Sequence, residues 1–134
     1  MKRIAVAMIM AIVAVGALAG DDDIYVPPYG SYLASNTYYN GVLSLGAPMT
    51  VLRIKKGTAT LSIDLNRNGL LETDEMLTFP ILDRGKLYEG RFREFAILIS
   101  YSPDIKSVIL LMSKPEDIYQ GRYNSGARYV FSEE

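Results

Sequence analysis

Short runs of β-branched and aromatic residues, separated by turn residues, are the feature that most limits what this sequence can fold into. From about Tyr32 onward the runs alternate apolar with polar residues, and no long helical period appears. Each run is followed closely by a turn and then by another run, which is the pattern of hairpins between sequence neighbours. We therefore expect an all-β fold, a small antiparallel meander that forms a barrel or a two-sheet sandwich.

The turn residues set the limits of the expected strands. We expect strands over residues 49–54, 58–63, 76–82, 86–92, 95–99, 108–112, 118–123 and 128–131. Pro80 lacks a backbone donor, so it predicts that the strand 76–82 lies at a sheet edge or contains a bulge. The runs 95–99 and 108–112 are almost wholly apolar, so we expect them at the centre of the sheet with both faces covered. Pro115 can open a single helical turn.

A Tyr-x-Gly-x-apolar pattern occurs three times, beginning at Tyr39, Tyr88 and Tyr119. In a strand the tyrosine, the glycine and the last residue share one face. A glycine inside a strand marks a bend or the close approach of another group. We therefore expect a ring from a neighbouring strand to cover each glycine, or the glycines to permit a strong bend. A tyrosine-lined ligand surface is the alternative interpretation.

Residues 1–19 have the order of a cleaved secretory signal helix. Two basic residues precede an apolar run over 4–15, and small residues then supply a cleavage site after residue 19. The run is shorter than the roughly 20 apolar residues that span a bilayer, so no membrane span is expected after cleavage. Residues 20–31, with three aspartates and two prolines, predict a flexible linker, and residues 32–134 predict a single β domain. The expected localisation is secreted or periplasmic.

The residue types that are missing exclude several kinds of chemistry. The chain of 134 residues contains no histidine, cysteine or tryptophan. Serine–histidine and cysteine–histidine nucleophiles, disulfides and the usual zinc sites are therefore excluded. Loss of the two basic residues of the signal leaves 12 basic and 15 acidic residues, a net charge of −3. The basic residues are scattered, so no nucleic-acid partner is expected.

Residues 64–75, DLNRNGLLETDE, match the calcium loop D-x-[DN]-x-[DN]-G-x5-E at every specified position. Calcium takes roughly six to eight oxygen ligands, and such a loop winds its donors around one point while a glycine, here Gly69, permits the sharp turn. Leu71 would turn inward toward the core. The expected ligands are the side chains of Asp64, Asn66 and Asn68, the backbone carbonyl of Leu70, Glu72 directly or through water, and both carboxylate oxygens of Glu75.

The loop resembles that of EF-hand proteins and, more loosely, the D-x-[DN]-x-[DN]-G loops of exported bacterial proteins, including dockerin-like modules. The resemblance does not extend to the flanks, because residues 58–63 alternate as a strand and Pro80 ends any helix that begins at Thr73. It therefore implies ion binding without the helix opening of calcium sensors. It also leaves open whether Glu75 or Asp74 reaches the ion.

A plain hairpin is the alternative interpretation of the same residues. Asn68-Gly69 is the favoured dipeptide of a type I′ turn, and Asp64 and Asn66 are ordinary turn residues. A hairpin would leave the acidic residues at 72–75 without a role. Two asparagines in place of aspartates lower the ligand charge, so we expect a calcium affinity of about 10⁻⁴ to 10⁻³ M, as in extracellular modules.

Together these features predict an exported, non-enzymatic β module with a calcium-binding loop that braces a turn, acting in binding or in envelope structure. One alternative is a small barrel that carries an apolar or aromatic ligand in its interior. Another is a glycoside-active enzyme with paired carboxylates, Asp74 with Glu75 or Glu116 with Asp117, although adjacent acids in a strand point to opposite faces. The sequence does not specify a protein or carbohydrate partner.

Overall fold

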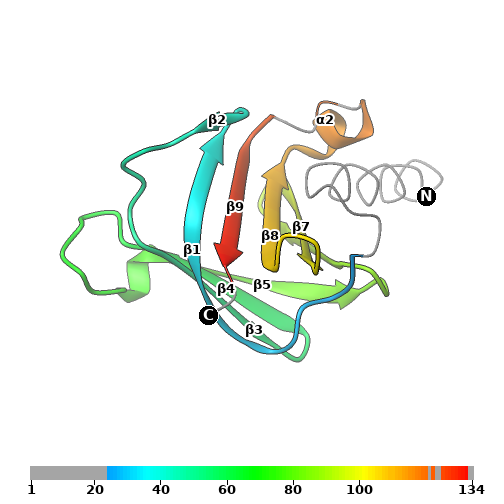
Figure 1. Cartoon of the computed structure of the whole chain (residues 1–134), viewed down its shortest axis with the longest axis horizontal. Helices are drawn as coiled ribbons and strands as arrows, with labels where there is room; N and C mark the ends of the chain where they lie inside the picture. Colours follow the sequence, from blue (N-terminus) through cyan, green and yellow to red (C-terminus); the bar gives the residue numbers. More distant parts are fainter. Residues whose placement is uncertain (1–23, 121, 123–124, 133–134) are drawn as a thin grey trace.

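The structure is a computed structural model, and it describes residues 24–120, 122 and 125–132. The expected signal helix at 1–19 lies outside the described residues. The described chain is all-β, with one short α-helix and one 3-10 turn (Figure 1). The elements are β1 (Gly30–Tyr39), β2 (Val42–Leu43), β3 (Thr50–Lys55), β4 (Thr58–Ile63), η1 (Thr73–Glu75), β5 (Met76–Asp83), β6 (Tyr88–Phe92), β7 (Phe95–Ser102), β8 (Ser107–Ser113), α2 (Pro115–Tyr119) and β9 (Ala127–Ser132).

The strands close into an antiparallel barrel. From β3 to β9 each strand pairs with the next one in the sequence, and β1 pairs with both β3 and β9, which completes the cycle. The short strand β2 adds only to the end of β1. The predicted meander is therefore confirmed, and of its two expected forms the chain adopts an eight-stranded barrel. Within the described part of the chain, no helix has the length and apolar character needed to cross a membrane.

The β3–β4 hairpin shows how the alternating runs become strands. Lys55 pairs with Thr58, so a two-residue turn joins the strands, and Gly57 in that turn has a φ of +77°, in the region that favours glycine. Leu52 and Ile54 of β3 are buried, while the residues that follow each of them are exposed. The hairpin expected at 49–54 and 58–63 is confirmed, and its apolar side chains point into the barrel.

The strand that contains Pro80 is a corner of the barrel and not an edge of the sheet. Residues 76–80 of β5 pair with β4, and residues 81–83 pair with β6. Pro80 lies where β5 stops pairing with β4 and begins pairing with β6. The ladder of backbone hydrogen bonds changes partner at this point, so a residue without a backbone N–H is tolerated there. The expectation of an edge or a bulge is corrected for this reason.

The glycines of the repeated tyrosine pattern have different surroundings. A Cβ built on Gly90 of β6 would lie 2.9 Å from Cδ2 of Phe79 in β5, so the expected ring cover is confirmed at this position. Gly41 lies instead with Asn40 in the turn between β1 and β2, where both have positive φ. The expectation of a strand glycine is wrong there, because an Asn-Gly pair favours a tight hairpin turn. Gly121 lies outside the described residues.

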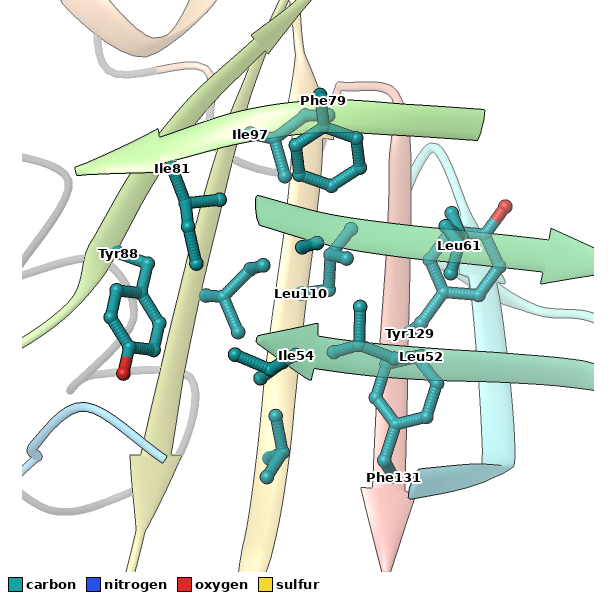
Figure 2. Packing of buried hydrophobic residues seen from close by; sticks show 13 residues of the cluster. Leu52, Ile54, Leu61, Phe79, Ile81, Tyr88, Ile97, Leu110, Tyr129 and Phe131 are labelled. Atoms are coloured by element: carbon teal, nitrogen blue, oxygen red, sulfur yellow. The ribbon is translucent and has the colours of Figure 1, made fainter. Parts of the chain in front are cut away.

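The strands β7 and β8 are covered on both faces, as their apolar sequences predict. Ile97 and Leu110 face inward and belong to the main core, whose side chains fill the barrel interior (Figure 2). Leu98 and Leu111 face outward and pack in a second cluster with Ile118 of α2. The helix therefore closes a small apolar layer on the outside of the barrel.

The segment after β8 differs from the strand expected over 118–123. The helix α2 occupies Pro115–Tyr119, with the proline at its first turn as expected. Asp117 in the same turn accepts hydrogen bonds from the side chains of Arg122 and Ser125, each at 2.9 Å. These local contacts favour the helical turn over an extended chain, so the predicted strand is wrong in its described part.

Residues 24–29, part of the expected flexible linker at 20–31, lie against the barrel. Tyr25 forms an antiparallel bridge with Tyr101 of β7 beyond the end of β6, with backbone hydrogen bonds of 3.1 and 2.7 Å. The hydroxyl of Tyr88 donates to the carbonyl of Pro27 at 3.3 Å. In its described part, this segment is therefore joined to the barrel by main-chain hydrogen bonds.

We expect Gly90→Ala to lower the free energy of unfolding by about 1–3 kcal/mol, because the new methyl group would overlap the Phe79 ring and meet the Pro80 carbonyl at 3.1 Å. Gly46→Ala is the matched control, since nothing lies within 4 Å of its added Cβ. Urea unfolding followed by circular dichroism measures both variants. Equal midpoints would contradict the close packing of β5 on β6.

Candidate metal loop

The candidate loop connects β4 to β5. The ladder between these strands ends at the pair Ser62–Met76, so residues 64–75 lie beyond it at one end of the barrel (Figure 1). The 3-10 turn η1 leads from the loop into β5. The loop is thus flanked by a strand and a single turn, as the sequence predicts, and not by the two helices of an EF-hand.

Asp64 fixes the start of the loop. Its side chain is buried, and its backbone N–H donates to the carbonyl of Met49 at 2.8 Å. Its carboxylate turns into the loop, where Oδ2 accepts the N–H of Gly69 at 2.8 Å and Oδ1 accepts the N–H of Asn68 at 3.3 Å. Two backbone donors therefore curl the first half of the loop around this carboxylate.

The centre of the loop is not the type I′ turn that a plain hairpin at Asn68-Gly69 would form. That turn needs positive φ at both residues. The positive φ values in this loop belong instead to Arg67, at +57°, and Gly69, at +81°. The expected type I′ turn at Asn68-Gly69 is therefore wrong, and twelve residues connect β4 to β5.

Glu75, and not Asp74, faces the inside of the loop. Glu75 is buried in η1, its Oε2 accepts the N–H of Asn66 at 3.2 Å, and its Oε1 accepts the N–H of Glu72 at 3.1 Å. Asp74 is exposed. The 3-10 turn therefore directs the last carboxylate of the motif back toward the residues at its beginning.

Glu72 is the acceptor shared by the two asparagines. Its Oε1 accepts the side-chain amides of Asn66 and Asn68, each at 2.8 Å. These two hydrogen bonds lower the pKa of the exposed Glu72 carboxyl below its ordinary value, and the bond from Asn66 has the larger effect. Desolvation and the charge of Asp64 oppose this shift with smaller effects. The structure thus brings three of the expected ligands into direct contact.

The two leucines of the loop have different surroundings. The N–H of Leu70 donates to Oδ1 of Asn68 at 2.9 Å, while its side chain is exposed. Leu71, which the sequence predicts to turn inward, is half-buried. The loop therefore has one partly inserted leucine and one that faces solvent.

Arg67 is a contact residue that the sequence analysis missed, because it lies at an unspecified position of the motif. Its guanidinium donates to the carbonyl of Gly46 at 2.5 Å, which joins the loop to residues 43–49. A groove of about 310 Å³ lies between that segment and residues 34–37 of β1. The loop is therefore in contact with a second irregular segment at the same end of the barrel.

Two buried carboxylates of the loop form no ion pair with the described residues. Asp64 and Glu75 are the two buried carboxylates among the described residues. The ion pairs of Arg84 with Glu89 and of Arg122 with Asp117 lie outside the loop. Buried charges in proteins are usually paired or coordinate a metal. Within the described part of the chain, the hydrogen bonds to these two carboxylates come from backbone N–H groups.

The carboxylates alone do not form a metal site. Among the residues that the structure describes, no three acidic side chains are grouped closely enough to hold an ion. Asp64, Glu72 and Glu75 instead direct their oxygens to backbone and amide N–H groups of the same loop. An ion here would therefore need the amide oxygens of Asn66 and Asn68 in addition to the acids.

The carboxylate pairs considered for catalysis face different surroundings. Asp74 is exposed while Glu75 is buried. Glu116 is exposed, whereas Asp117 forms an ion pair with Arg122 at 2.7 Å. This arrangement gives the glycoside-active interpretation no support.

We expect Asn66→Ala to raise the pKa of the Glu72 carboxyl toward its ordinary value, measured by carboxyl-carbon NMR titration without divalent cations. Because the pKa of Glu72 is lowered in the folded state, its hydrogen bond from Asn66 stabilises the fold at pH values above the unfolded-state pKa. This stabilisation is lost as the pH falls through the folded-state pKa. The stability difference between wild type and variant should therefore shrink in acid. Asn36→Ala, a change in β1, is the control, and an equal effect of both variants would contradict the contact.

Comparison of the chain with protein-family models, with curated proteins and with solved structures gives no match. The fold is therefore established by the strand pairing of this chain alone.

Proposed function

We propose that this chain is an exported, non-enzymatic β-barrel module whose loop at residues 64–75 binds calcium, and that the ion braces the connection between β4 and β5. The observation that carries the proposal is the pair of buried carboxylates, Asp64 and Glu75, which face the same loop and form no ion pair with the described residues.

A bound cation would relieve an electrostatic cost. A buried carboxylate without compensating charge is unfavourable by roughly several kcal/mol, and backbone N–H donors offset only part of this cost. A divalent ion among Asp64, Glu72 and Glu75 would supply the remaining compensation.

The donor atoms favour calcium. All the side chains proposed as ligands offer oxygen, and the chain has no histidine or cysteine to hold a softer metal. Magnesium demands near-ideal octahedral geometry at about 2.1 Å, whereas calcium accepts irregular sets of oxygens in flexible loops. Binding would turn the amide oxygens of Asn66 and Asn68 inward, in exchange for their hydrogen bonds to Glu72.

The proposed effect of the ion is mechanical. The ion would join the end of β4 to the turn before β5, and Asp64 also contacts Met49, the residue before β3. With millimolar calcium outside the cell and the expected affinity, mass action gives a stabilisation of about 0.5–1.5 kcal/mol. This is a brace on one connection, consistent with a role in binding or in envelope structure.

The expected signal at 1–19 supports this proposal, because export would bring the loop into contact with extracellular or periplasmic calcium. The missing catalytic residue types support a non-enzymatic role. The barrel that the interior-ligand alternative requires is present, but side chains occupy its interior (Figure 2). The loop therefore supports a function more directly than the barrel interior does.

We expect calcium to raise the melting temperature by about 2–6 °C relative to excess chelator, in proportion to the stabilisation estimated above. The shift should be lost in Glu75→Gln, which removes the inward carboxylate charge, and smaller for magnesium. Differential scanning calorimetry in each condition measures it.

Asp74→Asn is the matched control for this measurement, because it removes an exposed charge from the adjacent residue. It should keep the calcium shift. Wild-type melting temperatures that are equal with and without calcium would overturn the proposed ion site. Loss of the calcium shift in Asp74→Asn but not in Glu75→Gln would show that the last ligand is Asp74 and not Glu75.

A further inference from the structure

The candidate metal loop contains one of the two Asn-Gly dipeptides of the chain, Asn68-Gly69, and the other is Asn40-Gly41. In such a pair the backbone nitrogen of the glycine can attack the side-chain amide carbon of the asparagine within the same chain. The reaction is favoured by a base that takes the proton of the glycine N–H, by a donor to the amide oxygen, and by space for the succinimide ring that forms. The surroundings of each dipeptide therefore indicate which asparagine reacts.

The backbone nitrogen of Gly69 has a base beside it. Its N–H donates to Oδ2 of Asp64 at 2.8 Å, and this carboxylate is buried and forms no ion pair with the described residues. A carboxylate within hydrogen-bond distance of a proton is positioned to act as a general base. Removal of that proton makes the nitrogen a nucleophile, so Asp64 faces the atom that would attack.

The side-chain amide of Asn68 is held at both of its polar atoms. Its Oδ1 accepts the N–H of Leu70 at 2.9 Å, and its Nδ2 donates to Oε1 of Glu72 at 2.8 Å. When the amide carbon is attacked, negative charge develops on Oδ1, and the N–H of Leu70 stabilises this charge as a donor of an oxyanion hole does. The contact with Glu72 fixes the orientation of the amide.

The dipeptide in the loop also has space and access to water. Asn68 and Gly69 are both exposed. A Cβ built on Gly69 would meet nothing within 4 Å beyond its chain neighbours. A ring can therefore form at this place, and water can reach it.

The second dipeptide shares the donor but not the base. Oδ1 of Asn40 accepts the N–H of Gly126 at 2.9 Å, so its amide oxygen also has a backbone donor. Within the described part of the chain, the contact between a glycine N–H and a carboxylate is found at Gly69 and not at Gly41. Asn40 is therefore an internal control for the effect of Asp64.

We propose that Asn68 is a site of self-catalysed deamidation in the folded protein, with Asp64 as the base. The carboxylate takes the proton of the Gly69 N–H, a bond forms from this nitrogen to the amide carbon of Asn68, and the bond from that carbon to Nδ2 breaks. The departing nitrogen takes up the proton that Asp64 received, so ammonia leaves and a succinimide remains. Water then opens the ring at one of its two carbonyl carbons, which gives aspartate or isoaspartate at position 68.

Both products change the candidate metal loop, although the reaction itself needs no bound ion and does not depend on the proposed calcium site. Residues 64–75 contain four carboxylates and one guanidinium, a net charge of −3, and the new carboxylate makes this charge −4. An aspartate adds ligand charge to the proposed ion site, which favours calcium binding. An isoaspartate lengthens the main chain by a methylene group and displaces the residues that follow. The charge of the loop therefore changes as the protein ages.

The test is incubation of the wild-type protein in chelator at neutral pH, in native buffer and in denaturing urea, followed by proteolysis and peptide mass spectrometry. The mass increase from replacement of NH₂ by OH, assigned to Asn68 or to Asn40, gives the rate at each site. We expect the native rate at Asn68 to be at least about tenfold higher than its rate in urea and than the native rate at Asn40. A native rate at Asn68 that does not exceed either of these two rates would overturn the inference.

Asp64→Asn removes the base and should slow deamidation at Asn68 by about tenfold or more, in protein whose circular dichroism spectrum matches that of the wild type. Asp74→Asn is the matched control, because it removes an exposed carboxylate of the same loop, and it should react at Asn68 as the wild type does. An unchanged rate in folded Asp64→Asn would overturn the inference. The comparison with urea uses the wild type alone, so it decides the inference even if Asp64→Asn does not fold.

Discussion

Closure of the barrel depends on β1, which divides its backbone pairing between two strands. Residues 30–33 pair with β3, and residues 34–39 pair with β9, with a register shift at Ser35 between them. The Ser35 hydroxyl donates to the carbonyl of Val130 at 3.2 Å and lies 2.8 Å from the hydroxyl of Ser132. A bulge bends its strand and increases the local twist. The sheet therefore closes at this point, and its apolar inner face has no open edge to water.

The same division of β1 brings the candidate metal loop into contact with its neighbour. Because β1 separates from β3 after residue 33, the chain between β2 and β3 has to span the gap at that end of the barrel. Residues 44–49 do so, and they meet the loop through two hydrogen bonds, from Arg67 to the carbonyl of Gly46 and from the N–H of Asp64 to the carbonyl of Met49. The surroundings of the proposed ion site are thus a consequence of barrel closure.

The features that depend on local sequence could be predicted, and those that depend on distant pairing could not. The alternation of apolar and polar residues predicted the β3–β4 hairpin correctly. A barrel and a sandwich have the same alternation, and they are distinguished here by the pairing of β1 with β9, for example of residue 36 with residue 130. The motif predicts which residues of the loop could bind an ion, whereas the inward orientation of Glu75 and not of Asp74 depends on the 3-10 geometry of η1. The contact of Arg67 had no signal in the motif, because its partner is a backbone carbonyl remote in sequence.

The strands that flank the loop limit what an ion could change. In an EF-hand sensor, calcium acts by changing the angle between two helices. Here β4 and β5 are held by a ladder that runs from the pair Ser62–Met76 to the pair Thr58–Pro80, and these strands could separate only if the barrel opened. The free energy of ion binding would therefore alter the order and charge of the loop, and through Arg67 the position of residues 43–49. A metal at this place would change one surface of the molecule and leave its fold unaltered.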